Sequence, residues 1–318
     1  MRILILIPHS RVAWSGNRNT AERWASIFSD SGHEVSVESR YTDQEADLLV
    51  ALHGEKTQEG LLAFHAAHPS VPCVVVLTGT DLYPALSATS LRSLEVADEI
   101  VVLQEMALTS IPERYSNKVS VVVQSVVLPE MAPVKDEEGD FFDVCVVGHL
   151  REVKAPLLTA RAVRSLPEES KIRVRHGGEI IETQYRGWVA KEAAVNPRYQ
   201  WLGALDHSAA AALIAQSDLL VLTSVSEGGP AVLGEAIVAG TPVISTMNEG
   251  AVGILGENYT GLFPVGDQAA LTALLRRCEV DEPFYRGLKE EAVALADQFS
   301  PGREKEALAG LIEKVMSK

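Results

Sequence analysis

Short apolar runs alternate with stretches of helical period along most of this chain, and this alternation constrains its fold more than any other feature. Strands that are separated by helices predict a parallel, doubly wound sheet with helices on both faces. The strand-like runs of the first part are Ile3–Ile7, Glu34–Glu38, Leu48–Leu52, Cys73–Leu77, Glu99–Leu103 and Val119–Val123.

The segment after the first run shows the helical part of the pattern. Ala21, Trp24, Ala25 and Phe28 recur at the spacing of one helix face, so we expect them to be buried together. Gly32 then supplies a helix stop.

The alternation breaks at Pro129–Asp140, where two prolines and the acidic run Asp136–Glu138 indicate a linker. It then restarts. The second series of expected strands is Phe142–Val147, Ile172–Val174, Asp218–Leu222 and Pro242–Ser245. The expected helices are Pro156–Ser165, Ala209–Ala215, Ala231–Ala239, Ala269–Cys278 and Arg303–Val315.

We therefore predict an α/β protein of two doubly wound, Rossmann-like domains, residues 1–133 and 134–318, facing a central cleft. Ligands of such sheets bind at the carboxyl ends of the strands. The last helix belongs to the second domain by sequence, and packing back on the first domain is the alternative.

Charge and composition narrow the function classes. The formal net charge of −15 argues against nucleic acid or an anionic membrane as the main partner, and it means that any anion site must be a local basic pocket. No apolar run reaches the roughly 18 residues that span a bilayer. The three cysteines, Cys73, Cys145 and Cys278, fit reduced structural thiols of a cytoplasmic protein, with a catalytic cysteine as the alternative.

Two glutamates, Glu227 and Glu235, frame the most informative segment. Gly228, Gly229 and Pro230 between them open a predicted helix after an apolar strand. Glycines let a ligand approach the free N–H groups at the positive end of a helix, and a carboxylate one turn further can accept two hydrogen bonds from a ribose. This arrangement suits a nucleotide, and an ordinary strand–loop–helix with solvated acids is the alternative.

Two basic residues follow the first strand of the second series. That strand ends at Gly148, and Arg151 and Lys154 come three positions apart, so both can face the same side of a loop or helical turn. They could neutralise a diphosphate and stabilise charge on a leaving group. The alternative is a solvated basic face.

A second candidate anion site lies at the start of the first predicted helix. Gly16 and Asn17 can take turn conformations with their N–H groups directed into the cleft, and Arg18 adds positive charge. A plain helix cap by Asn17 or Asn19 is the alternative.

Two further strand ends of the first series point to the same cleft. One carries His53 and Lys56, and the other carries Thr80 and Asp81. Asp81 could accept hydroxyl protons from a sugar. A lone histidine such as His53 or His176 is more often a hydrogen-bonded structural residue than a catalyst.

Several other chemistries lack their motifs. No His/Cys cluster has metal-ligand spacing, and no Asp-x-Asp pair is present, so we expect diphosphate binding without a metal. The sequence holds neither a Gly-x-Ser-x-Gly elbow nor a Walker loop.

The segment from Glu227 to Glu235, Gly148 with Lys154 after it, and Ala239–Val243 resemble the second half of the family 4 retaining glycosyltransferases of the GT-B fold. The resemblance implies that Glu235 holds the nucleotide ribose and Glu227 the donor sugar. The donor-binding residues that it implies are Gly148, His149, Arg151, Lys154, Glu227, Gly228, Gly229, Pro230 and Glu235. An arginine usually follows the glycine in that family, and His149 stands there, so Arg151 is expected to share the diphosphate with Lys154. The expected catalytic residues are Glu227, Arg151 and Lys154.

A closer resemblance covers nearly the whole chain. The segments Ser15–Arg18, Leu77–Tyr83, Val102–Glu105, Gly148–Glu152, Pro197–Gly203 and Leu255–Tyr259 are similar to the SenB group, the selenosugar synthases of selenoneine biosynthesis. The group's usual residues differ at three places: Ala-Arg for Gly54-Glu55, Asp for Ala155, and Ala-Asn for Pro230-Ala231.

The resemblance implies transfer of a sugar from UDP-GlcNAc or UDP-glucose to selenophosphate, with the UDP-sugar as co-substrate and no further cofactor. The expected acceptor-binding residues are Gly16, Asn17, Arg18, His53, Lys56, Thr80 and Asp81. A retaining glycosyltransferase with a hydroxyl acceptor and a non-catalytic subunit that binds a sugar nucleotide are the alternatives.

Overall fold

The computed structural model describes residues 1–9, 16–129 and 140–317, which form two compact units. The first unit comprises Met1–Gln124, Glu227–Gly229 and Pro301–Lys318, and the second comprises Ser125–Ser226 and Pro230–Ser300. The boundary predicted at residues 133 and 134 lies outside the described residues.

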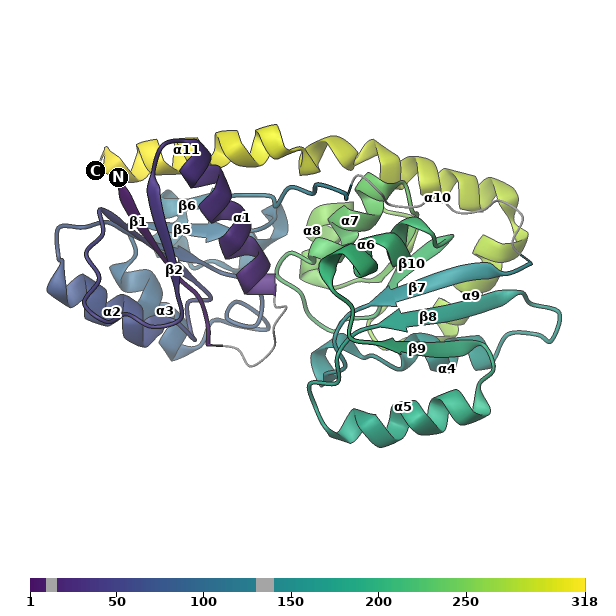
Figure 1. The fold of residues 1–318 in the computed structure, drawn as a ribbon. Helices are drawn as coiled ribbons and strands as arrows, with labels where there is room; N and C mark the ends of the chain where they lie inside the picture. Colours follow the sequence, from purple (N-terminus) through teal and green to yellow (C-terminus); the bar gives the residue numbers. More distant parts are fainter. Residues whose placement is uncertain (10–15, 130–139, 318) are drawn as a thin grey trace. The chain divides into compact units, whose positions relative to one another are not determined.

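The first unit contains a parallel sheet of six strands in the order β2-β1-β3-β4-β5-β6 (Figure 1). Its strands are β1 (Arg2–Leu6), β2 (Glu34–Glu38), β3 (Leu48–Leu52), β4 (Cys73–Val76), β5 (Glu99–Val102) and β6 (Val119–Val121). Its helices are α1 (Gly16–Asp30), α2 (Gln58–Ala67), α3 (Ala88–Val96) and α11 (Pro301–Met316), with 3-10 turns η1 (Glu105–Ser110) and η2 (Glu113–Lys118).

Alternate residues of these strands enter two separate cores, because successive side chains of a strand point to opposite faces. Leu49 and Ala51 of β3 face a core with Leu61 and Phe64 of α2. The other core holds the remaining β3 residues together with the α1 and α11 side chains Trp24, Phe28, Leu308, Leu311 and Val315. Helices therefore cover both faces, and the central strands β3 and β4 are apolar throughout, as is typical of buried parallel strands.

The last helix is fastened to α1 by a buried carboxylate. Glu304, which is 1% exposed, accepts hydrogen bonds from Trp24 Nε1 at 2.8 Å and from Arg23 Nε at 2.9 Å. Near its other end Lys314 pairs with the buried Glu99 of β5. Both contacts compensate charges that burial would otherwise make costly.

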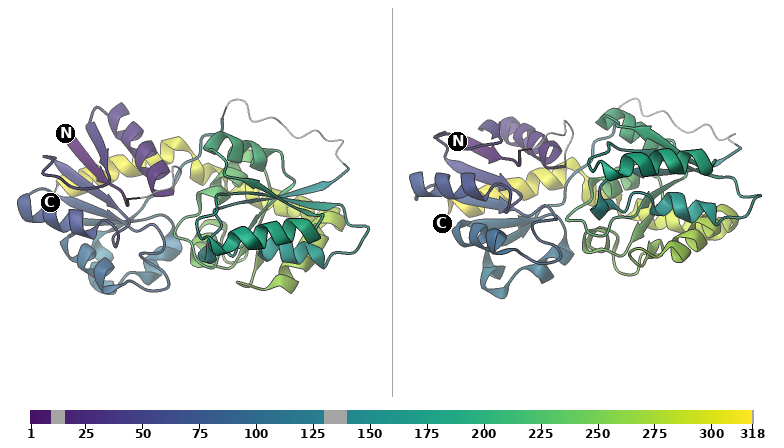
Figure 2. Two further views of the ribbon diagram at one scale, coloured as in Figure 1. Left: turned by 60° about the horizontal axis from the view of Figure 1, so that its bottom comes forward. Right: turned by 90° about the horizontal axis from the view of Figure 1, so that it is seen from below.

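The second unit has a sheet of the same kind, in the order β12-β11-β10-β7-β8-β9, again parallel throughout. Helices lie on both sides of this sheet (Figure 2). Its strands are β7 (Phe142–Val147), β8 (Ile172–Gly177), β9 (Tyr199–Gly203), β10 (Leu219–Leu222), β11 (Val243–Thr246) and β12 (Leu262–Phe263). Its helices are α4 (Leu158–Arg164), α5 (Gln184–Val195), α6 (His207–Ala215), α7 (Ala231–Ala239), α8 (Glu249–Leu255), α9 (Gln268–Val280) and α10 (Glu282–Ala294), with 3-10 turns η3 (Glu152–Lys154) and η4 (Ala296–Phe299).

Side-chain caps fix where several of these helices begin. Asp206, Asn248 and Asp267 each precede a helix and accept the backbone N–H three residues on, which satisfies a donor that has no partner inside the helix. Helix α7 ends at Gly240, whose φ of +74° is the left-handed conformation of a glycine stop.

In both sheets, the side on which the chain adds new strands changes at the first strand. In the first unit the chain adds β2 on one side of β1 and β3 to β6 on the other, and in the second it adds β8 and β9 on one side of β7 and β10 to β12 on the other. The crevice of a doubly wound sheet forms at this reversal, outside the carboxyl ends of the two flanking strands. The pairs β1/β3 and β7/β10 therefore locate the candidate sites.

Candidate functional site

A small pocket lies at the reversal point of the second sheet, where β7 and β10 end. Residues of β7, β8 and β10 and of the loops that follow β7 and β10 line it, namely Val146, Val147, Gly148, Lys154, Pro156, His176, Val221, Leu222, Thr223 and Ser224. The structure thus brings the predicted donor residues Gly148 and Lys154 together at one pocket.

The loop after β7 is held firmly beside this pocket. The Thr223 hydroxyl donates to the carbonyl of Lys154 at 2.9 Å, and the Val225 N–H donates to the carbonyl of Val153 at 2.8 Å. Arg151 caps the turn η3, and its Nε has no hydrogen-bond partner among the described residues. Predicted donor residue His149 lies in the same loop, where its Nδ1 accepts the N–H of Glu179 at 3.2 Å.

His176 supports this loop through a hydrogen bond to the Gly148 carbonyl, which is the role of a structural histidine. It is 1% exposed, its Nδ1 lies 2.9 Å from the Tyr199 hydroxyl, and its Nε2 lies 3.1 Å from the carbonyl oxygen of Gly148. A carbonyl can only accept, so Nε2 carries the proton and Nδ1 accepts from Tyr199. Burial lowers the pKa of His176 to about 4, which keeps the ring neutral at neutral pH.

The Glu227 segment leads into α7 as the sequence predicted. Helix α7 spans the expected residues Ala231–Ala239, and Pro230 is the residue directly before it. Glu235 lies inside the helix with its side chain 15% exposed, and its Oε1 is 3.8 Å from Nδ1 of His207. Glu227, Gly228 and Gly229 group with the first unit.

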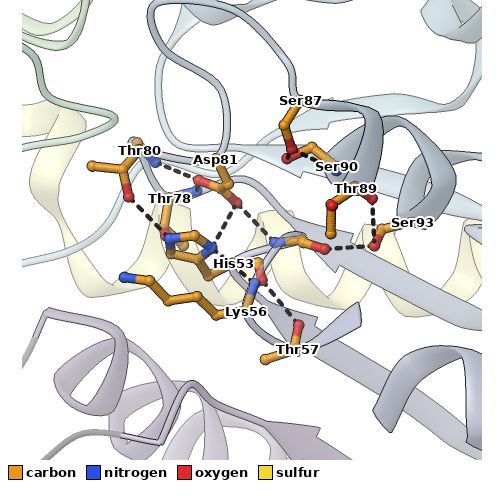
Figure 3. Close-up of polar contacts among 12 residues, drawn as sticks. His53, Lys56, Thr57, Thr78, Thr80, Asp81, Ser87, Thr89, Ser90 and Ser93 are labelled. Atoms are coloured by element: carbon orange, nitrogen blue, oxygen red, sulfur yellow. Dashed lines mark hydrogen bonds and ion pairs between the residues drawn. The ribbon is translucent and has the colours of Figure 1, made fainter. Parts of the chain in front are cut away.

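At the reversal point of the first sheet, His53 follows β3 with a φ of +69°, a conformation that is uncommon for a residue with a side chain. Its Nε2 lies 3.0 Å from the Thr80 hydroxyl, and its Nδ1 receives a long contact of 3.4 Å from the Lys56 N–H (Figure 3). Burial lowers the pKa of His53, although the nearby Asp81 carboxylate opposes this effect. The structure thus brings three of the predicted acceptor residues together: the buried His53 and the exposed Lys56 and Thr80.

Asp81 has a different role from the one that we expected. Its side chain is fully buried, and its carboxylate accepts the backbone N–H groups of Gly54, Thr78 and Gly79 at 2.8, 3.0 and 2.9 Å (Figure 3). These bonds tie the loop after β3 to the loop after β4. The expectation that Asp81 receives the hydroxyls of a sugar does not fit this arrangement, because backbone donors already surround its oxygens.

The structure also corrects the turn conformations expected at Gly16 and Asn17. Both residues and Arg18 lie in the first turn of α1, which begins at Gly16, so the segment is helical. Arg18 pairs with Glu22 one turn later at 3.4 Å, and the first turn of α1 carries no acidic residue. Trp14 and Ser15, which precede it, lie outside the described residues.

The thiols have no sign of reactivity. Cys73, Cys145 and Cys278 are buried and free, and burial raises the pKa of each to about 12. They are therefore protonated at neutral pH and poor nucleophiles, as the structural interpretation requires.

The described residues contain neither a metal-binding cluster nor a helix that could cross a membrane. Within residues 1–9, 16–129 and 140–317, no group of three or more His, Cys, Asp or Glu side chains could hold a metal ion. In the same ranges, no helix has both the length and the apolar character needed to cross a membrane.

Sequence reasoning did not single out Ser224, although it lies only three residues before Glu227. Ser224 lines the pocket and is 1% exposed. Its position directly after an apolar strand was a usable signal, but only the strand order shows that this strand lies next to β7.

Comparisons with known proteins bear on the fold and on the family of this chain. A search of curated proteins gave no significant match. Among solved structures, HepE from Anabaena in complex with UDP and glucose is 16% identical, with a TM-score of 0.78, and the alignment covers 98% of this chain and 99% of that one.

Two further structures show the same fold. A sucrose-phosphate synthase from Thermosynechococcus elongatus is 16% identical, with a TM-score of 0.74 and 99% of each chain covered. A glycosyltransferase from Rickettsia africae is 14% identical, with a TM-score of 0.76, covering 99% of this chain and 98% of that one. The two parallel six-stranded sheets therefore form a GT-B fold.

The decisive match is to a protein family. The family model of glycosyl transferases group 1 matches residues 127–294, a span that contains the pocket, the loop with Lys154 and the Glu227–Glu235 motif. The chain is an enzyme that belongs to glycosyl transferases group 1.

Proposed function

We propose that this enzyme transfers a sugar from a UDP-sugar, UDP-GlcNAc or UDP-glucose, to selenophosphate. The observation that carries the donor half is the pocket between the ends of β7 and β10, where Lys154 and Gly148 meet at the reversal point of the sheet. The acceptor half is supported by the resemblance of the whole sequence to the SenB group.

The donor would be held through its charge and its ribose. Lys154 and Arg151 supply positive charge for the diphosphate, which a chain of net charge −15 must provide locally. Glu235 is partly exposed inside α7 and would accept the ribose hydroxyls, while Glu227 would hold the donor sugar. HepE, which has the same fold, has been solved with UDP-glucose.

The reaction needs little proton transfer. The bond between the anomeric carbon and the diphosphate oxygen breaks, UDP leaves with the electron pair, and selenium forms the new bond to that carbon. Selenium in selenophosphate is already anionic near neutral pH, so it needs no strong base. The enzyme's contribution is then positioning of the substrates and stabilisation of the leaving diphosphate.

The start of α1 would attract the charged acceptor. Its first turn presents backbone N–H groups with Gly16, Asn17 and Arg18 and contains no acidic residue. Helix N-termini favour anions because the peptide dipoles and the unpaired N–H groups act together. His53 and Lys56 belong to the same unit and are the further acceptor residues of the proposal.

The test is to incubate the enzyme with UDP-GlcNAc or UDP-glucose and freshly made selenophosphate under reducing, oxygen-free conditions. We expect a selenium-bearing sugar and an equal amount of UDP by mass spectrometry. Arg18→Ala should raise the KM for selenophosphate more than that for the UDP-sugar, whereas Arg114→Ala, an exposed arginine of η2, should change neither.

The alternative acceptor gives a different outcome. UDP that appears only when hydroxyl compounds are offered, never with selenophosphate, would replace this proposal by an ordinary retaining glycosyltransferase. No turnover of any UDP-sugar, despite tight binding, would favour a sugar-nucleotide-binding subunit.

A further inference from the structure

The pocket between the ends of β7 and β10 contains a hydroxyl that no described residue satisfies. Ser224 lines this pocket and is 1% exposed, and its Oγ has no hydrogen-bond partner in the described part of the chain. Buried hydroxyls nearly always have a partner, because losing water without a replacement is costly. An unmet hydroxyl at a candidate site therefore calls for a functional explanation.

The backbone around Ser224 is fixed, so its position is not the result of a loose loop. Its carbonyl accepts hydrogen bonds from the Thr246 hydroxyl at 2.5 Å and from Asn248 Nδ2 at 3.2 Å. The next residue, Val225, donates its N–H to Val153. The segment is thus held between the end of β11 and the loop after β7, and the hydroxyl is the part of Ser224 left for a ligand.

The rest of the pocket wall decides which ligand group fits. The Thr223 hydroxyl already donates to the Lys154 carbonyl, and both ring nitrogens of His176 are engaged. No carboxylate lines the pocket. The Ser224 hydroxyl is the group of this wall that has no partner among the described residues, and it shares the pocket with the positive charge of Lys154. A hydroxyl donor in the same pocket as a cation suits an anionic oxygen rather than a sugar hydroxyl.

We infer that the Ser224 hydroxyl donates a hydrogen bond to a phosphate oxygen of the nucleoside diphosphate-sugar, beside Lys154. This inference rests on the proposed function, which supplies the nucleotide. It adds a binding residue from the end of β10 to those from the loop after β7, so that both strands at the reversal point contribute to the diphosphate site.

The test uses Ser224→Ala, with Thr159→Val as its matched control. Thr159 lies on α4, is also 1% exposed and also has a hydroxyl without a partner among the described residues, but it does not line the pocket. Calorimetry should be run on each folded protein with uridine, UDP and the UDP-sugar.

We expect Ser224→Ala to weaken UDP and the UDP-sugar equally, by about ten- to a hundred-fold, as for a lost hydrogen bond to a charged group. Uridine should bind unchanged, and Thr159→Val should bind all three ligands like the wild type. The melting temperature of ligand-free Ser224→Ala should stay equal or rise, because the change removes an unsatisfied buried group. A merely structural serine would give the opposite: lower stability and intact affinity.

Each remaining outcome contradicts a defined part of the inference. Wild-type affinity for UDP in Ser224→Ala would refute the hydrogen bond alone and leave the proposed donor intact. Loss of affinity for the UDP-sugar but not for UDP would move the contact to the sugar, and an equal loss for uridine would mean a distorted site. Failure of the wild type itself to bind UDP would overturn the proposed donor together with this inference.

Discussion

Two residues with side chains hold left-handed backbone conformations beside the candidate sites. His53 follows β3 with a φ of +69°, and Ala155 follows η3 with a φ of +42°. Such conformations cost about 1–2 kcal/mol for a residue such as alanine, and they persist where surrounding contacts enforce them. At Ala155 the Thr223 hydroxyl lies 3.2 Å from the carbonyl, so the strained turn that carries Lys154 is held from β10. The usual Asp of the SenB group tolerates this conformation better than Ala.

Glu235 gives the residue-scale prediction. Its side chain is only 15% exposed, so a ribose bound to it would meet a partly desolvated carboxylate, where a hydrogen bond contributes about 1.5–3 kcal/mol. Glu235→Ala should weaken UDP by that amount in calorimetry, and the exposed Glu290→Ala should not. UDP affinity unchanged in a folded Glu235→Ala protein would remove Glu235 from the ribose site.

At the scale of elements, the sequence predicted the strands better than the helices. The core strands β1, β3, β4, β5, β7 and β10 were recognised to within two residues because most of their residues are apolar and buried. Helix α5 was not expected. Its inward side includes Glu192, which is 5% exposed because it pairs with Arg164. A buried carboxylate on the inward side breaks the apolar periodicity on which sequence reasoning depends.

The candidate sites show the same limit. Gly148, Lys154 and Glu235 could be selected because glycine, a basic residue and an acid follow apolar runs. The supporting role of Asp81 could not be read, since it depends on two loops from β3 and β4 lying side by side. Ser224 also required the strand order, because β10 pairs with β7 rather than with its sequence neighbour β9.

His176 of β8, which lies between the Tyr199 hydroxyl and the Gly148 carbonyl, gives a prediction about pH. Burial lowers the pKa of His176 to about 4 in the folded protein, while the unfolded chain keeps a value near 6.5. Below about pH 6.5 the unfolded state binds a proton that the folded state refuses, so stability is fully present above that pH and falls as the pH drops toward 4. Between pH 7 and pH 5 this one group should remove about 2 kcal/mol of unfolding free energy.

The test is urea unfolding at pH 7 and at pH 5, followed by a signal that reports on the second unit, in the wild type and in His176→Gln. We expect the variant to be less stable at pH 7, because it loses bonds to Tyr199 and Gly148, and to lose less stability than the wild type on acidification. Equal losses in both proteins would show that His176 titrates normally in the folded state.

At the scale of the whole molecule, the negative net charge opposes the binding of anionic substrates. In the proposed reaction, a chain of net charge −15 has to bind a diphosphate and a second anion, while its average field repels both. Local cations at Lys154, Arg151 and Arg18 are one solution and a bound metal is the other. The sequence contains no Asp-x-Asp pair, and in the described ranges no three His, Cys, Asp or Glu side chains gather to hold a metal.

We therefore expect side chains rather than a metal to offset the diphosphate charge. Initial rates of UDP release should be the same with and without a chelator, at constant ionic strength, and added magnesium or manganese should not increase them. Raising the salt concentration should instead lower the affinity for UDP, because dissolved ions weaken the attraction between partly exposed charges. The screening length is about 10 Å at 0.1 M salt. A rate that disappears with the chelator and returns with either metal would show that the protein's cations are insufficient, and the donor site would then need metal ligands, a role that the proposal gives to neither Glu227 nor Glu235.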